Sequence, residues 1–199
     1  MQSGQEKAWE ILRGLDPGEV CRNAGVAYDK TSGLYTLRSL GMDFRLSPKD
    51  NGISSDAPGS DILLGRLGYF FKLSVPWYLI GAKDIPLSGR LIKPADLTGG
   101  QLFFRGTHVL PLDKLAARYT GDLNGFLEKG KTLGGEAQSY GDASFSLSPL
   151  PRMPATLILW AADEEFPPRA DLLFDSTCEF HAPLDIIWTV AMMSILVLF

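Results

Sequence analysis

The alternation of apolar and polar positions in the first quarter of the chain predicts a small sheet. The run Leu34–Ser39 alternates in this way, and so does the run Met42–Ser47. Residues two apart in a strand point to the same face, so each run has one buried face and one solvated face. A third short run, Val26–Tyr28, precedes them. Short turns separate the three runs, and an antiparallel meander is therefore predicted.

The middle of the chain has helical periodicity. Residues Asp61–Ile80 form a strongly apolar segment, in which Pro76 is expected to kink or end the helix because proline lacks a backbone N–H. The segment Pro111–Leu133 carries an apolar stripe at helical spacing. Gly121 and Gly125 weaken its middle, so one long helix and two shorter helices are both open interpretations.

The last third of the chain changes character. Three strands are predicted, at Ala143–Ser148, Ala155–Trp160 and Ala170–Phe174, and an apolar helix at Ile186–Phe199. These patterns together predict an α+β fold. It has an N-terminal antiparallel meander, central helices, a C-terminal three-stranded sheet segment and a final apolar helix, within a single compact domain, 1–199.

The uncharged run Ile186–Phe199 is the one membrane-like feature of the sequence. It is about six residues short of the ~20 that span a bilayer, so we predict no membrane span. Its apolar surface is too wide for one neighbouring element. We expect the helix either to pack in the core or to contact a protein partner or a second copy of the chain.

Composition and charge exclude some classes of function. The 199 residues carry a formal net charge of −4 and no basic block, so we expect no nucleic-acid binding. Residues 1–10 are polar and do not resemble a secretory leader. We therefore predict a cytoplasmic protein whose two cysteines, Cys21 and Cys178, are reduced thiols.

One stretch formally matches a phosphate-binding loop. Residues Gly125–Thr132 read GFLEKGKT, which fits the spacing GxxxxGK[ST]. A functional loop of this type follows a strand and opens a helix. This stretch lies inside a helical stripe and follows no predicted strand, so we interpret it as a chance match.

A long pattern near the C-terminus resembles a known family. Residues Gly141–Ser176 read GDASFSLSPLPRMPATLILWAADEEFPPRADLLFDS. This segment is similar to the signature of an uncharacterised prokaryotic family, domain of unknown function 3786. The resemblance implies an origin mostly among anaerobes, relatives with an added iron–sulfur module, and settings of corrinoid or one-carbon metabolism. It implies no catalytic residue, and two cysteines alone cannot hold a cluster.

The acidic turn Asp163, Glu164 and Glu165 joins two predicted strands and is the first candidate cofactor site. Adjacent carboxylates bind hard cations or share a proton, although a solvated turn has the same composition.

His108 precedes a predicted helix start and is the second candidate cofactor site. It could act as a base or as an axial ligand to a tetrapyrrole metal, or simply bond to local backbone.

Cys178 and His181 form a candidate metal site. The spacing CxxH suits borderline metals, which accept thiolate and imidazole ligands together. A zinc site needs further ligands, and these would have to come from His108, Cys21 or the acidic turn. The alternative is a small buried cysteine beside a helix-entry loop.

Two main hypotheses for function follow. The first is a non-catalytic accessory module that binds a cofactor or partner protein in anaerobic redox or one-carbon metabolism. The second is a metal- or cofactor-dependent enzyme in which His108, the Asp163–Glu165 turn and Cys178/His181 meet in one cleft. A third is a structural subunit that docks through its C-terminal helix.

Overall fold

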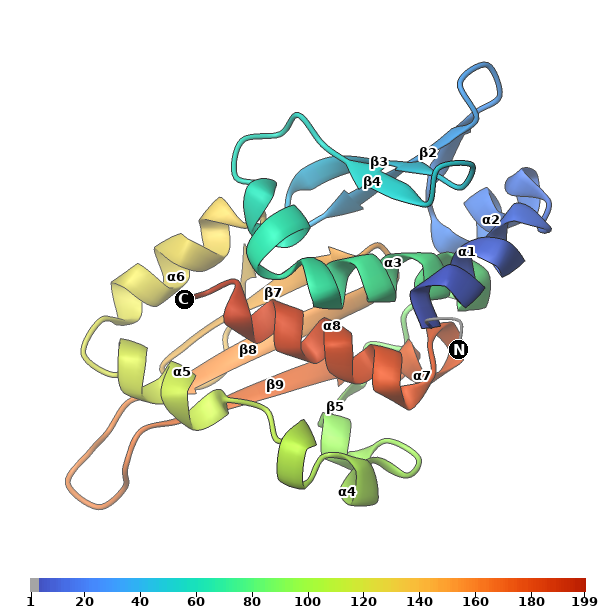
Figure 1. Ribbon diagram of the computed structural model, residues 1–199. Helices are drawn as coiled ribbons and strands as arrows, with labels where there is room; N and C mark the ends of the chain where they lie inside the picture. Colours follow the sequence, from blue (N-terminus) through green and yellow to red (C-terminus); the bar gives the residue numbers. More distant parts are fainter. Residues whose placement is uncertain (1–3) are drawn as a thin grey trace.

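Two antiparallel sheets and a set of helices packed against them make up the fold (Figure 1). The computed structural model describes residues 4–199, so residues 1–3 of the predicted domain lie outside the described part. The small sheet contains β1 (Ala27–Asp29), β2 (Leu34–Ser39), β3 (Met42–Ser47) and β4 (Gly52–Ser54). The larger sheet contains β5 (Leu91–Ile92), β6 (Glu136–Ala137), β7 (Ala143–Leu150), β8 (Met153–Trp160) and β9 (Arg169–Asp175).

The helices lie mainly on one side of the larger sheet. The α-helices are α1 (Gly4–Arg13), α2 (Pro17–Ala24), α3 (Gly68–Gly81), α4 (Gly100–Phe103), α5 (Leu112–Tyr119), α6 (Leu123–Thr132), α7 (Cys178–His181) and α8 (Leu184–Leu196). Shorter turns are the π-helical η1 (Ile62–Arg66) and the 3₁₀ turns η2 (Pro94–Asp96) and η3 (Gly106–His108). The predicted α+β class is confirmed.

The small sheet is the predicted meander, with strand order β1-β2-β3-β4. Leu37 pairs with Phe44, and both side chains are fully buried, as the period-two pattern predicted. The Phe44 ring lies 4.6 Å from the ring of Phe71 on α3, which fixes the sheet on that helix. Strand β4 lies in a segment whose composition resembles a loop, and at three residues it is too short to show a period.

The larger sheet has the order β5-β9-β8-β7-β6, so the three predicted strands form its centre. Strand β7 continues to Leu150 and β8 begins at Met153, which leaves a tight two-residue turn between them. The pairing register shifts between Leu147 and Leu150. This irregularity accommodates Pro149, which cannot donate to a regular ladder.

The two faces of the larger sheet differ. One face packs against helices, and there the Phe145 ring lies 4.6 Å from the ring of Phe126 on α6. The other face carries hydroxyl side chains, among them Ser146 and Thr156. Because side chains alternate along each strand, β7 and β8 are apolar toward the helices and more polar on the opposite side.

The predicted helix Asp61–Ile80 is divided into η1 and α3. Pro76 lies inside α3 and does not end it, because the helix is held by packing on both sides. A side-chain hydrogen bond of 2.7 Å joins Ser74 of α3 to Thr189 of α8 within the core. Tertiary contacts of this kind outweigh the hydrogen bond that a proline removes.

The predicted segment Pro111–Leu133 forms two helices, α5 and α6, with the break at Gly121. The Asp122 carboxylate caps α6 by accepting a hydrogen bond of 2.8 Å from the Gly125 amide. The stretch GFLEKGKT therefore lies along a helix that follows another helix. It is not a phosphate-binding loop, as the sequence context indicated.

Replacing Gly130 should show how closely α6 packs on the sheet. A Cβ atom on Gly130 would lie 2.5 Å from the Phe145 ring, so Gly130→Ala is expected to lower the free energy of unfolding by roughly 1–3 kcal/mol. Gly121→Ala is the matched control, since a Cβ atom there meets nothing within 4 Å. Urea denaturation followed by circular dichroism measures both. Equal stabilities for the two variants would contradict this packing.

The C-terminal apolar helix α8 lies in the core of the chain itself. Its buried side chains include Ile186, Val190 and Ile195. On the side that faces α3, Thr189 forms the hydrogen bond with Ser74. Within residues 4–199 no helix has the length and apolar character needed to cross a membrane. A partner contact through α8 stays a prediction, and it would have to use its few exposed positions.

Candidate functional site

A hollow lies at the end of the β8–β9 hairpin, where the predicted acidic turn is located. We call it the hairpin pocket, and its volume is about 510 Å³. In Figure 1 this hairpin loop extends away from the helices at the lower left. The pocket is lined by Asp142, Trp160, Ala161, Asp163, Phe166, Pro167 and Arg169. All of these residues belong to the segment Gly141–Ser176 that carries the family resemblance.

Asp163 builds the turn. Its Oδ1 atom accepts hydrogen bonds from the backbone amides of Glu165, at 2.8 Å, and Phe166, at 2.7 Å. These two bonds hold the pKa of the exposed Asp163 carboxyl below its usual value. The carboxylate therefore stays charged, and the turn holds Phe166 at the mouth of the pocket.

The opposite wall is set by Gly141 and Asp142. Gly141 has φ +57°, and a Cβ atom there would lie 2.7 Å from Ile158 Cγ2 and 2.8 Å from the Leu159 carbonyl oxygen. Only glycine fits this close approach. Asp142 Oδ2 then accepts a hydrogen bond of 2.8 Å from the Ala161 amide, which ties the start of β7 to the end of β8.

Trp160 and Arg169 face each other across the hairpin. They are register partners, and the Arg169 guanidinium carbon lies 4.4 Å from the centroid of the Trp160 ring. The indole N–H donates a hydrogen bond of 3.3 Å to Asp171. Among the described residues Arg169 forms no ion pair, so its guanidinium is held by the indole ring alone.

The charge around the hairpin pocket is predominantly negative. The carboxylates of Asp142, Asp163, Glu164 and Glu165 lie on the wall and the turn, against the single guanidinium of Arg169. Phe166 exposes 66% of its surface beside them. An exposed aromatic ring in a pocket with an excess of carboxylates suits a ligand group that is cationic at one end and apolar along its length.

His108 lies elsewhere, against α8. The residue is half-buried. The centroid of its ring lies 4.4 Å from that of the Phe103 ring and 5.0 Å from that of the Trp188 ring. Its backbone carbonyl accepts a hydrogen bond of 3.0 Å from the Trp188 indole. The histidine therefore joins η3 to α8.

Cys178 and His181 lie in the short helix α7 and are buried. Burial, and after it the nearby Glu179 and Asp175 carboxylates, raise the pKa of Cys178 to about 12, so the thiol is protonated. His181 Nδ1 accepts a hydrogen bond of 3.2 Å from the Lys83 amide, while its Nε2 atom is buried without a partner. Burial is the main cause that lowers the pKa of His181, followed by Arg152.

The predicted site residues do not converge on one cleft. The acidic turn precedes β9 and α7 follows it, so the turn and the Cys178/His181 pair lie at opposite ends of a seven-residue strand, roughly 20 Å apart. Within residues 4–199 no group of three or more histidine, cysteine or acidic side chains is placed to hold a metal ion. The metal assignment to Cys178 and His181 stays a prediction.

Sequence reasoning found the acidic turn but missed the rest of the pocket. Trp160 ends an apolar strand, and Arg169 begins the next one. A signal was available, because counting outward from the turn of an antiparallel hairpin pairs these two residues. Asp142 carries no comparable signal, since its position beside Ala161 depends on how β7 pairs with β8.

Comparisons with known proteins agree with the resemblance of the sequence. A search of curated proteins and a search of solved structures each found no match. A family model described as "Domain of unknown function (DUF3786)" matches residues 16–196, which is most of the chain and includes all of the hairpin pocket. The protein therefore belongs to the DUF3786 family.

Proposed function

We propose that this protein is a non-catalytic binding module whose hairpin pocket docks a basic segment of a partner protein. The observation that carries the proposal is the exposed Phe166 ring, which lines the same hollow as Trp160 and the carboxylates of Asp142 and Asp163. Two more carboxylates, Glu164 and Glu165, lie exposed in the adjoining turn. A lysine or arginine side chain of a partner would lay its methylene groups on the aromatic rings. Its charge would lie among the carboxylates.

The geometry of the pocket supports binding rather than catalysis. Asp163 and Asp142 each use one oxygen atom to hold backbone amides, which leaves their second oxygens for a ligand. The Arg169 guanidinium braces the indole of Trp160 from one side. A rigid aromatic wall with fixed acceptors is preorganised, so binding of a partner costs less free energy for ordering the site.

Basic peptides should bind at this pocket. In a ¹H–¹⁵N spectrum of the full chain, the Trp160 indole signal, identified by its loss in Trp160→Phe, is expected to shift on addition of an amphipathic lysine–leucine peptide. A glutamate–leucine peptide of the same length should leave it in place, because the carboxylates repel it. Equal shifts with both peptides, or none with either, would refute the proposal.

The charge contribution can be tested without disturbing the fold. Glu164 and Glu165 are exposed, so the double variant Glu164→Gln/Glu165→Gln is expected to weaken lysine–leucine binding about threefold to tenfold. Glu128→Gln is the matched control, since Glu128 is exposed on α6. Titration at low and high salt separates the charge term from apolar contact. Equal weakening in the control would remove the assignment to the acidic turn.

Three expectations stay predictions from the resemblance and the sequence. They are a cofactor at His108 or the acidic turn, a setting in anaerobic redox or one-carbon metabolism, and a cytoplasmic location.

The alternative function is a metal- or cofactor-dependent enzyme. The separation of the acidic turn from Cys178 and His181, at opposite ends of β9, weighs against a cleft that these groups share. Stoichiometric metal in protein purified without oxygen, lost in His181→Asn, would favour the enzyme.

A further inference from the structure

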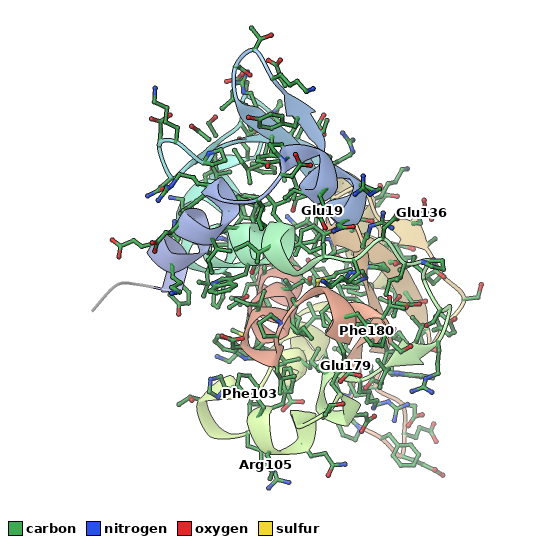
Figure 2. All side chains as sticks on the ribbon, turned by 90° about the vertical axis from the view of Figure 1, so that its right-hand side faces the viewer. Glu19, Phe103, Arg105, Glu136, Glu179 and Phe180 are labelled. Carbon is green, nitrogen blue, oxygen red and sulfur yellow. The ribbon has the colours of Figure 1, made fainter. Side chains whose placement is uncertain are left out.

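A second hollow lies on the face of the larger sheet that points away from the helices. We call it the hydroxyl groove, and its volume is about 390 Å³. Figure 2 shows Glu136, which lines it, on the side of the sheet opposite the helical layer. The floor consists of Ser146, Ser148, Pro154 and Thr156, on β7 and β8. It is separate from the hairpin pocket, with which it shares no residue.

The hydroxyl groups of the floor are not used by the fold. Ser146 and Thr156 are register partners, and their side chains form no hydrogen bond with any residue in the range 4–199. The same holds for Ser148. Thr156 is only 4% exposed, yet it lines the groove. Its hydroxyl oxygen is accessible from the groove, where water or a ligand group can bond to it.

The walls of the groove are held in place. On one side, Asp175 accepts hydrogen bonds from the Ser88 and Gly89 amides, which fixes the segment carrying Leu87 and Leu91. On the other side, Ser144 Oγ accepts a hydrogen bond of 2.9 Å from the Tyr140 amide. These bonds preorganise both walls around the hydroxyl floor.

The charge of the groove selects against anions. Its lining contains two carboxylates, Glu136 and Asp175, and no lysine or arginine. Asp175 already accepts several hydrogen bonds, whereas the exposed Glu136 carboxylate is available to accept from a ligand. A phosphate or carboxylate ligand would meet repulsion without a compensating cation.

We infer that the hydroxyl groove binds a neutral saccharide of one or two sugar units. Sugar hydroxyls both donate and accept, which matches the threonine and serine hydroxyls of the floor and the Glu136 and Gln138 side chains of the wall. The Tyr140 ring is 45% exposed, and with Leu87 it offers an apolar surface to the C–H face of a sugar ring. The volume falls within the range of small-ligand sites.

The test uses the full chain with glucose, N-acetylglucosamine, maltose and cellobiose as neutral probes, and glucuronate and glucose 6-phosphate as charged ones. Saturation-transfer NMR is expected to detect binding of at least one neutral sugar. Thr156→Val should weaken this binding about tenfold, because valine has nearly the same volume as threonine but lacks the hydroxyl group. Thr36→Val on the small sheet is the matched control. The double variant Glu164→Gln/Glu165→Gln should leave sugar binding unchanged, which separates this site from the hairpin pocket.

The inference is overturned by any of three results. These are no signal from every neutral sugar, stronger binding of the charged sugars, or unchanged affinity in Thr156→Val. A melting temperature of Thr156→Val close to that of the natural chain shows that the variant is folded, since valine is a good strand residue. Tyr140→Ala provides a second variant at an exposed position, and it should reduce the signal from the sugar's ring protons.

Discussion

Asp175→Ala is expected to lower the free energy of unfolding by about 3 kcal/mol or more. Asp175 is buried at the end of β9 and accepts five hydrogen bonds, from the amides and hydroxyls of Ser88 and Thr177 and from the Gly89 amide. Truncation removes the acceptor of all five bonds, and of these donors the Ser88 hydroxyl alone retains a second hydrogen-bond partner among the described residues, Ser176. Urea denaturation of the variant and the natural chain measures the difference.

The acid dependence of stability provides an independent check on Asp175. Burial would raise its pKa, but hydrogen bonds from Thr177 and Ser88 outweigh burial and lower the pKa to about 2. The folded state therefore favours the carboxylate. Its contribution is complete above the ordinary pKa of 3.8 and is lost as the pH falls through about 2.

A matched control for Asp175 lies on the small sheet. Asp43 forms an exposed ion pair of 2.9 Å with Arg38, and such pairs contribute about 1 kcal/mol at most. Asp43→Ala should therefore have a small effect. If Asp175→Ala were no more destabilising than Asp43→Ala, the loop that carries Ser88 and Gly89 would not be held as the structure indicates.

Protonation of His181 is expected to produce the second large effect, a loss of stability between neutral and mildly acidic pH. Burial lowers its pKa, Arg152 adds to this, and Asp175 opposes both. Between the folded-state pKa and the unfolded value of 6.5, the unfolded chain binds the proton more readily, so stability rises with pH. The contribution is complete above pH 6.5 and is lost as the pH falls through the folded-state pKa.

The slope of stability against pH has an upper bound. One titrating group changes the free energy of unfolding by at most about 1.4 kcal/mol per pH unit. Urea denaturation at several pH values from 4.5 to 7.5 measures the slope. His181→Asn should flatten it, while His108→Asn, which alters the only other histidine, should leave it. An unchanged slope in His181→Asn would assign the pH dependence to other groups.

Much of the fold was predictable because its long elements carry a clear period. Strands β2 and β3 alternate, and β8 is a continuous apolar run, so each could be located from the sequence alone. The two-residue strands β5 and β6 could not be located, because they exist only through pairing with β9 and β7. Continuation of α3 through Pro76 likewise depends on packing against α8, which no local preference reveals.

Part of the candidate site could likewise be predicted from the sequence, and part could not. The acidic turn could be identified from its composition, since Asp163 bonds to amides two and three residues ahead, a local interaction. The Arg169–Trp160 contact and the hydroxyl groove join residues brought together by strand pairing, and the groove also needs walls from two distant segments. The proximity of these groups is a property of the folded chain.

By itself, the sequence determined the α+β class, the central strands, the apolar C-terminal helix and the segment that identifies the family. These follow from periodicity and local composition, which act over a few residues. Only the tertiary structure decided that α8 is buried, that Cys178/His181 and the acidic turn lie at opposite ends of β9, and that the hydroxyls of β7 and β8 face an open groove. The physical reason is that burial, distance and charge between remote residues arise when the chain closes its long loops, and no local preference encodes them.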